Sequence, residues 1–444
     1  MNRKEALNII SESSVYGNLG LFIGAGMSMA ILNDEWQSVA LSWKELIFKC
    51  AQEFDIDLKE DVNKEGLSYP EIATEIAKII AEKNDITYSF AIKRLKEKIC
   101  DLTSWYPEED KRNEYGKLLL DIDPSWIITT NYDLIIECIL TGKCISLEPN
   151  DQLISPQRLI PVYHLHGIRT NPSSIIISQE DYISLFRPNQ YRQQKLSLSI
   201  KESTTLIIGY GLGDVNVLTA VDWTKNVYSQ QRINYPHDII QLLYCKDPAP
   251  NPYRDRNDIL ILEFDDLQEI LSEIADSITK ATEIADRKNL ELIQVNEVLK
   301  NPSEKDVDKF IDDDDFRLSI IKEISEDGIQ LISGFLELFS KAMDKTWERA
   351  TPRNAFHAYK ENLQILLDII EQISLQKIPP ALMQSIAYNL DRVSYYVGED
   401  LGESRAAYRM WNNRKDNIPI ETMTEIKNIA VAREYYRIKR LYKN

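Results

Sequence analysis

The chain has 444 residues, of which 43% are hydrophobic and 27% charged, and its formal net charge is −18. This length predicts about two or three domains, and the composition excludes a largely disordered chain. The negative charge argues against direct binding to nucleic acid, because phosphates repel such a chain unless basic residues gather locally.

The number of cysteines is odd, and no two of them have the CxxC spacing of a zinc or redox site. They are Cys50, Cys100, Cys138, Cys144 and Cys245. This pattern predicts a reducing compartment, with neither a disulfide framework nor a cysteine zinc site. The first residues lack the long apolar core of a signal peptide, and no run of about eighteen apolar residues occurs. We therefore expect a soluble cytoplasmic protein that does not enter a membrane.

Short apolar runs typical of buried strands alternate with helical patterns up to about residue 265. The predicted strands are Leu19–Ile23, Ser125–Thr129, Pro161–Leu165, Ser174–Ser178, Thr204–Ile208, Ile239–Tyr244 and Ile259–Phe264. Most are apolar without strict alternation, as in strands that are buried on both faces of a parallel sheet. This pattern predicts an α/β fold with a Rossmann-like, doubly wound, mostly parallel sheet.

Residues 42–121 contain no clear strand, and we interpret them as a helical insertion that forms a lid or an oligomer surface. Ser42 with Glu45, and Ser68 with Glu71, have the spacing of capping boxes that open two of its helices.

After residue 265 the patterns are helical only, which predicts an all-α domain over residues 291–444 after an α/β domain over residues 1–290. The predicted helices are Leu267–Leu299, Phe316–Thr346, Asn354–Ser374, Pro380–Val397, Glu403–Asn413 and Thr422–Leu441. The last of them would carry Arg433, Arg437 and Arg440 on one face. We interpret that face as solvated, with contact to an acidic partner as the alternative.

Four segments at the carboxyl ends of predicted strands carry the candidate chemistry, because open α/β sheets bind ligands at that edge. In the first, a strand enters the turn Gly24-Ala25-Gly26, with Ser28 shortly after it. Small residues let the backbone approach a phosphate, although many such turns hold no ligand.

In the second segment, Thr129-Thr130-Asn131-Tyr132-Asp133 stands at the end of a strand. Asn131 or Asp133 could simply cap the next helix, but four polar groups exceed what a cap requires.

The third segment holds two of the four histidines of the chain, His164 and His166, followed by Gly167. Alternation places both side chains on one face of the strand. We interpret His164 as a hydrogen-bonded core histidine and His166 as functional. A metal site formed by the pair is not expected, since no third metal ligand accompanies them.

The fourth segment runs from Gly209-Tyr210-Gly211 to Asp214, whose carboxylate could cap a helix or bind a ribose hydroxyl. It lacks the GxGxxG fingerprint of dehydrogenases.

Together these segments resemble the sirtuin family and, more closely, its divergent bacterial members that consume NAD⁺ in anti-phage defence. The resemblance covers about residues 15–265, and Ile175–Tyr182 also looks like a segment of those effectors. It implies that Asn131 and His166 are catalytic, His166 as the base. It also implies a set of NAD⁺-binding residues, which are Gly24, Ala25, Gly26 and Ser28 at the pyrophosphate and adjacent ribose, Thr130 and Asp133 with Asn131 around the nicotinamide ribose, and Gly209, Tyr210 and Asp214 toward the adenosine.

Three departures from the family pattern limit the function. The zinc-binding cysteine pairs are missing, and Ser42-Trp43-Lys44-Glu45 stands near the place of the usual Pro-Asp-Phe-Arg run. Both argue against protein deacylation. Gly211 replaces a common serine, which removes one hydrogen bond on the adenosine side.

The resemblance therefore implies a regulated NAD⁺ hydrolase that releases nicotinamide and ADP-ribose without a metal, with cyclisation as a lesser outcome. The alternatives are a non-hydrolytic sensor of NAD⁺ or ADP-ribose that assembles a complex, and a protein deacylase. The expected partners are further copies of the chain and either a HerA-type ATPase or a phage-derived activator. The chain contains no GxxxxGK[ST] phosphate loop, so such an ATPase would be a separate polypeptide.

Overall fold

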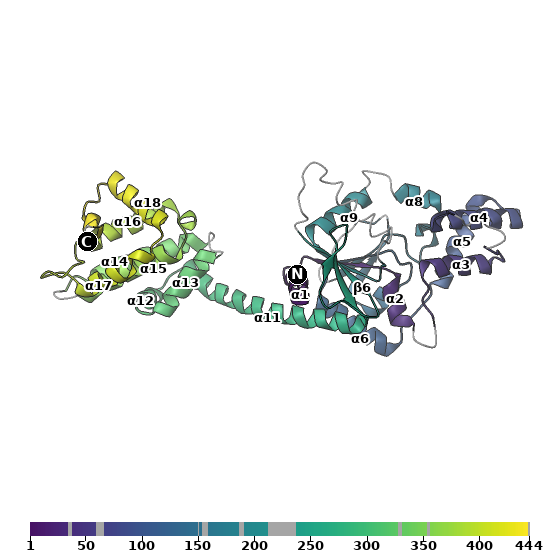
Figure 1. Cartoon of the computed structure of the whole chain (residues 1–444), viewed down its shortest axis with the longest axis horizontal. Helices are drawn as coiled ribbons and strands as arrows, with labels where there is room; N and C mark the ends of the chain where they lie inside the picture. The colour runs from purple at the N-terminus through teal and green to yellow at the C-terminus, as the bar shows by residue number, and fades with distance from the viewer. Residues whose placement is uncertain are drawn as a thin grey trace. The chain divides into compact units, whose positions relative to one another are not determined.

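A computed structural model describes residues 1–33, 38–58, 66–149, 151–152, 159–185, 191–211, 237–326, 331–352 and 356–442. The chain divides into two compact units, residues 1–285 and 286–444 (Figure 1). The division falls within one long helix, α11 (Leu267–Lys300).

The first unit is built on an eight-stranded sheet with the strand order β3-β4-β2-β1-β5-β6-β8-β7. Its strands are β1 (Leu19–Ile23), β2 (Trp126–Thr129), β3 (Cys144–Leu147), β4 (Ile160–His164), β5 (Thr204–Ile208), β6 (Ile239–Tyr244), β7 (Tyr253–Arg254) and β8 (Leu260–Phe264). All neighbouring pairs are parallel except β7 with β8. The predicted α/β class with a mostly parallel sheet is therefore confirmed.

Helices cover both faces of this sheet (Figure 1), which explains why its central strands are mostly apolar. The helices of the first unit are α1 (Arg3–Val15), α2 (Ala25–Leu32), α3 (Trp43–Glu53), α4 (Tyr69–Asn84), α5 (Tyr88–Leu102), α6 (Glu109–Ile122), α7 (Ile135–Ile139), α8 (Gln179–Leu185), α9 (Tyr191–Glu202) and the first part of α11. Leu21 of β1 packs in the core formed with α1, α6, α7 and α11. Phe22, the next residue, packs in a separate core that includes Ile200 of α9.

The predicted helical insertion comprises α3 to α6, and α3, α4 and α5 enclose a hydrophobic core of their own. Both predicted capping boxes form. The Glu45 carboxylate accepts a hydrogen bond from the backbone N–H of Ser42 at 2.8 Å, and Glu71 does the same for Ser68 at 2.7 Å. Tyr132, from the loop after β2, belongs to the same core, so the insertion packs directly against one of the candidate segments.

The topology creates a crevice beside the carboxyl ends of β1 and β5, which are neighbours in the sheet. The chain leaves β1 toward β2 on one side, and it leaves β5 toward β6 on the other side. Such a switch point separates the connecting segments and leaves room for a ligand. The turns that begin at Gly24 and Gly209 both lie at this point.

The structure corrects one predicted strand. Ser174 is the last residue of a 3-10 turn (Pro172–Ser174), and residues 175–178 lie outside the sheet. Ile175 and Ile177 are buried against the insertion, so their apolar character comes from that packing. The backbone N–H of Ile176, between them, donates a hydrogen bond to the His166 carbonyl at 2.8 Å and not to a strand of the sheet. Strands β3 and β7 were missed, because only one of the four residues of β3 is buried and both residues of β7 are exposed.

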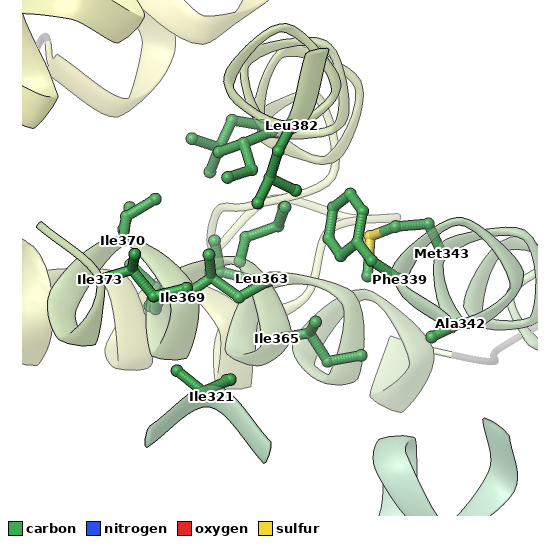
Figure 2. Packing of buried hydrophobic residues seen from close by; sticks show 14 of the residues in the cluster. Ile321, Phe339, Ala342, Met343, Leu363, Ile365, Ile369, Ile370, Ile373 and Leu382 are labelled. Carbon is green, nitrogen blue, oxygen red and sulfur yellow. The ribbon is translucent and has the colours of Figure 1, made fainter. Parts of the chain in front are cut away.

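In its described residues, the second unit consists of helices: α12 (Glu304–Asp312), α13 (Asp314–Glu326), α14 (Ile332–Arg349), α15 (Phe356–Gln372), α16 (Pro380–Ser394), α17 (Arg405–Arg414) and α18 (Ile420–Ala432), with short 3-10 turns. The predicted all-α character is confirmed. Figure 2 shows its core, where Ile321 of α13, Phe339 and Met343 of α14, Leu363 and Ile369 of α15 and Leu382 of α16 come together.

Apart from shifts of a few residues at helix ends, three features of this unit differ from the sequence prediction. Phe316–Thr346 is two helices, α13 and α14. The capping box of Ser303 and Asp306 opens α12, which was not predicted. The last helix ends at Ala432, because Glu434 adopts a φ of 59°, and a separate 3-10 turn follows. Arg433, Arg437 and Arg440 therefore do not share one helical face. No helix in the described part of the chain is long and apolar enough to cross a membrane.

Candidate functional site

A cavity of about 290 Å³ opens beside the carboxyl ends of β1, β2, β4 and β5. Among the predicted site residues, it is lined by Ala25, Gly26, Thr130, Asn131, Asp133, His166, Gly209 and Tyr210. Ser28 lies directly behind the wall, hydrogen-bonded to two of these residues. Gly24 begins the first turn without lining the cavity, and Asp214 falls outside the described residues.

The two glycine turns contact each other backbone to backbone. A Cβ on Gly26 would lie 2.8 Å from the Gly209 Cα, and Gly209 has a φ of +79°. The N–H groups of Gly24 and Gly26 donate to the carbonyls of Ile208 and Gly209, at 2.8 and 3.0 Å. These glycines are thus required for the close approach of the turns, and their two N–H groups are already engaged. Their contact with a pyrophosphate stays a prediction.

The loop after β2 is held against β1 by its first threonine. The Thr129 hydroxyl donates to the Ile23 carbonyl at 2.9 Å and accepts the N–H of Asn131 at 3.0 Å. The hydroxyls of Thr130 and Tyr210 are hydrogen-bonded across the cavity wall. These bonds restrict where the Asn131 side chain can stand.

A chain of hydrogen bonds links the polar side chains at the base of the cavity. The Asn131 amide donates to the Ser28 hydroxyl at 3.1 Å, and that hydroxyl donates to Asp133 Oδ2 at 3.1 Å. Asp133 Oδ1 accepts the N–H of Ile135 at 3.0 Å, so this carboxylate also caps α7. Burial raises the pKa of Asp133 to about 6, against the lowering effects of these hydrogen bonds and of the nearby His164.

His164 is fully buried and bonded at both ring nitrogens, which confirms its interpretation as a core histidine. Its Nδ1 donates to the Asn131 carbonyl at 3.0 Å, and its Nε2 lies 2.7 Å from Glu137 Oε1. Burial by itself would lower the pKa of His164, but the hydrogen bond and charge of Glu137 outweigh burial and raise it. Burial by itself would raise the pKa of Glu137, but the charge and hydrogen bond of His164 outweigh burial and lower it. The two residues form a buried ion pair behind Asn131.

His166 reaches the cavity from the end of β4 and is only 4% exposed. Its ring packs edge-on against Tyr182, with centroids 5.4 Å apart and the Tyr182 hydroxyl 3.5 Å from Nδ1. The next residue, Gly167, has a φ of +95°, and a Cβ there would meet the Ser174 carbonyl oxygen at 2.3 Å. The Ile175–Tyr182 segment therefore holds His166 in place.

The helical insertion supplies the remaining wall of the cavity. Its lining residues are Ser42, Trp43, Leu46, Thr103 and Trp105, and Leu41, directly before the insertion, lines the cavity too. None of these residues is predicted from the sequence to belong to the site. The one available signal was Ser42-Trp43-Lys44-Glu45, which stood where the family pattern was broken.

A second cavity, of about 520 Å³, adjoins the first and shares Gly26, Gly209 and Tyr210 with it. It is lined by the ends of β5, β6 and β8 and by residues of α6, and it contains the carboxylates Asp265 and Asp266. Among the described residues, no group of three or more His, Cys, Asp or Glu side chains is arranged to hold a metal ion.

Residues 125–260 match a family model described as a SIR2-like domain. The chain is 22% identical to Defense-associated sirtuin 2 of Bacillus subtilis, over 51% of this chain and 21% of that protein. It is 27% identical to NAD(+) hydrolase ThsA of Enterococcus faecium, over 53% of this chain and 46% of the relative. It is 26% identical to NAD(+) hydrolase ThsA of Bacillus cereus (strain MSX-D12), over 49% of this chain and 42% of that protein.

The chain thus spans less than half the length of each of these relatives. The matches support the resemblance to sirtuin-like proteins of bacterial defence. The region that matches the family model contains Asn131, Asp133, His166 and Gly209, but not the Gly24-Ala25-Gly26 turn.

Proposed function

We propose that the first unit is an NAD⁺ glycohydrolase, which cleaves NAD⁺ into nicotinamide and ADP-ribose. The observation that carries this proposal is the convergence of Asn131, Asp133 and His166 on one cavity at the switch point of the sheet. The similarity to proteins named NAD(+) hydrolase supports it at the level of the family.

The two adjoining cavities fit the two halves of a dinucleotide. The nicotinamide riboside would occupy the cavity that contains Asn131 and His166, and the adenosine would occupy the second cavity. The pyrophosphate would then cross at Gly26 and Gly209, which both cavities share. Glycines at this crossing leave the backbone uncovered, which suits a bulky anionic group.

In the reaction, the bond between ribose C1′ and the pyridinium nitrogen breaks, and its electron pair neutralises that nitrogen. Positive charge develops on the ribose, and the buried Asp133 carboxylate would stabilise it. Asn131 would position a water molecule, whose oxygen bonds to C1′. His166, in its neutral form, would accept the proton that the water loses. Water is the only co-reactant, and the products are nicotinamide, ADP-ribose and a proton.

A freely active NAD⁺ hydrolase would deplete its own cell, so we extend the proposal to regulation. The protein would act in the cytoplasm as an effector of anti-phage defence that removes NAD⁺ on a signal. The insertion, which forms one cavity wall, and the second unit are the parts available for control. The proposed partners are further copies of the chain, and either a HerA-type ATPase or a phage-derived activator.

The test is nicotinamide release from NAD⁺, followed by chromatography, with the purified full chain alone and together with the products of neighbouring genes and phage lysate. Asn131→Ala and His166→Ala should each lower the rate at least about 100-fold. His357→Ala is the matched control, because His357 lies exposed in the second unit. Binding of NAD⁺ without nicotinamide release would favour the sensor. Wild-type rates in both site variants would refute the mechanism.

A further inference from the structure

One polar group in the wall of the first cavity has no hydrogen-bond partner among the described residues. The indole Nε1 of Trp43 is buried from solvent, and no acceptor meets it. Trp43 is the first residue of α3 and lines the same cavity as Asn131, Asp133 and His166. A buried N–H without an acceptor is costly, and such groups are rare in folded proteins.

We propose that Trp43 is a specificity-determining residue, whose indole N–H donates to the carboxamide oxygen of nicotinamide. This inference rests on the proposed function, since it places the nicotinamide end of NAD⁺ in this cavity.

The Trp43 ring is held in a defined orientation. Its centroid lies 5.2 Å from that of Tyr69, and 6.0 Å from that of Tyr182 with the rings stacked at 26°. Tyr182 in turn contacts His166. The capping box of Ser42 and Glu45 fixes the start of α3, where Trp43 stands. An indole fixed in this way loses little conformational entropy when it binds a ligand.

The surroundings of Trp43 suit a flat heteroaromatic ring that carries one polar group. Leu46 and Trp105 supply apolar and aromatic contact. Thr103 is engaged elsewhere, since its hydroxyl donates to the Ile99 carbonyl at 2.8 Å. The Trp43 N–H is therefore an unpaired donor of a residue in this wall. In NAD⁺ the ring nitrogen is bonded to the ribose and cannot accept a hydrogen bond, so the carboxamide oxygen is the strong acceptor of the nicotinamide end. A carboxylate in its place, as in nicotinic acid, would bring a second negative charge into the cavity of Asp133.

The direct test follows the indole N–H resonances of ¹⁵N-labelled full-length protein during titration with nicotinamide. The signal that disappears in Trp43→Phe should move on titration. Trp43→Phe keeps an aromatic ring and removes the N–H, so its affinity for nicotinamide should fall roughly tenfold, the loss expected for one hydrogen bond. Trp347→Phe is the control, because the Trp347 indole bonds to Asn389 in the second unit, and it should bind nicotinamide as wild type does.

Ligand analogues test the same bond without a variant, which matters if Trp43→Phe folds poorly. Wild-type protein should bind thionicotinamide several-fold more weakly than nicotinamide, because sulfur is the weaker acceptor. It should bind 3-acetylpyridine, which keeps the carbonyl, with less loss. An unmoved Trp43 signal, or equal affinity of wild type and Trp43→Phe for nicotinamide, would overturn the inference.

The failure of this inference differs from the failure of the proposed function. If NAD⁺ is cleaved and the Trp43 signal does not move, only the role of Trp43 falls. If nicotinamide moves that signal and NAD⁺ is never cleaved, the subsite stands and the hydrolase falls.

Discussion

Replacing Asp133 by asparagine should stabilise the first unit while it impairs NAD⁺ cleavage. Asp133 is 5% exposed, and burial raises its pKa from 3.8 to about 6. The ionised carboxylate is therefore held in the fold at a cost in free energy, as is common where a charge serves a reaction. Asparagine keeps the shape of the side chain and an oxygen that can accept the N–H of Ile135.

The magnitude follows from the two pKa values. At 1.36 kcal/mol for each pKa unit, a change from 3.8 to about 6 corresponds to about 3 kcal/mol. Because the folded pKa is raised, this cost is absent below about pH 4, grows as the pH rises toward 6, and is complete above it. The hydrogen bond donated by Ser28 would be lost, which offsets about 1 kcal/mol. The net gain of Asp133→Asn is about 2 kcal/mol at pH 8, and below about 1 kcal/mol at pH 5.

Native-state hydrogen exchange of the amides in β1, β2 and β5 measures the opening free energy of this unit by itself. Asp276→Asn is the control, since Asp276 is exposed on α11 and its replacement should change this free energy by no more than about 0.5 kcal/mol. A variant that is no more stable than wild type at pH 8 would refute the reasoning, and so would a gain of equal size at both pH values.

Two further predictions concern the supports of the site. Gly26→Ala should destabilise the first unit by about 1–3 kcal/mol, because its Cβ would meet the backbone of Gly209 at 2.8 Å. Gly211→Ala is the control for stability, since its Cβ would have nothing within 4 Å, and equal unfolding midpoints for the two variants would contradict the prediction. Glu137→Gln should cost about 3 kcal/mol and bring the pKa of His164 below 6.5, since burial then acts without a counter-charge. The raised pKa of His164 stabilises the fold below pH 6.5, and this contribution is lost as the pH rises through the pKa of His164 in the folded protein. The lowered pKa of Glu137 stabilises the fold above pH 4.5, and this contribution is lost as the pH falls through the pKa of Glu137 in the folded protein. The loss of stability in Glu137→Gln should therefore be largest between pH 4.5 and 6.5, which hydrogen exchange can measure. NMR can follow the titration of His164, and a titration unchanged from wild type would exclude the ion pair.

Local sequence patterns were sufficient for the central strands of the sheet and for the location of the candidate segments. β1, β5 and β6 begin and end where the predicted runs do, because a strand covered on both faces is apolar at most of its positions. In a parallel sheet all carboxyl ends meet at one edge. Asn131, Asp133, His166 and Gly209 could therefore be expected close together before their coordinates were known, and they line one cavity.

The tertiary structure decided which other residues share that cavity and what state they are in. Ile175 and Ile177 look like a strand, but they pack against an insertion that lies about a hundred residues earlier in the chain. Trp43 comes from that insertion, and its unpartnered N–H is apparent only once α3 lines the same cavity as the residues that follow β2 and β4. The raised pKa of Asp133 and the pairing of His164 with Glu137 depend likewise on burial and on distances of a few ångströms. Periodicity along the chain reports which face of an element is apolar, whereas hydrogen bonding and electrostatic energy depend on which elements meet, and this is set by the packing of the whole unit.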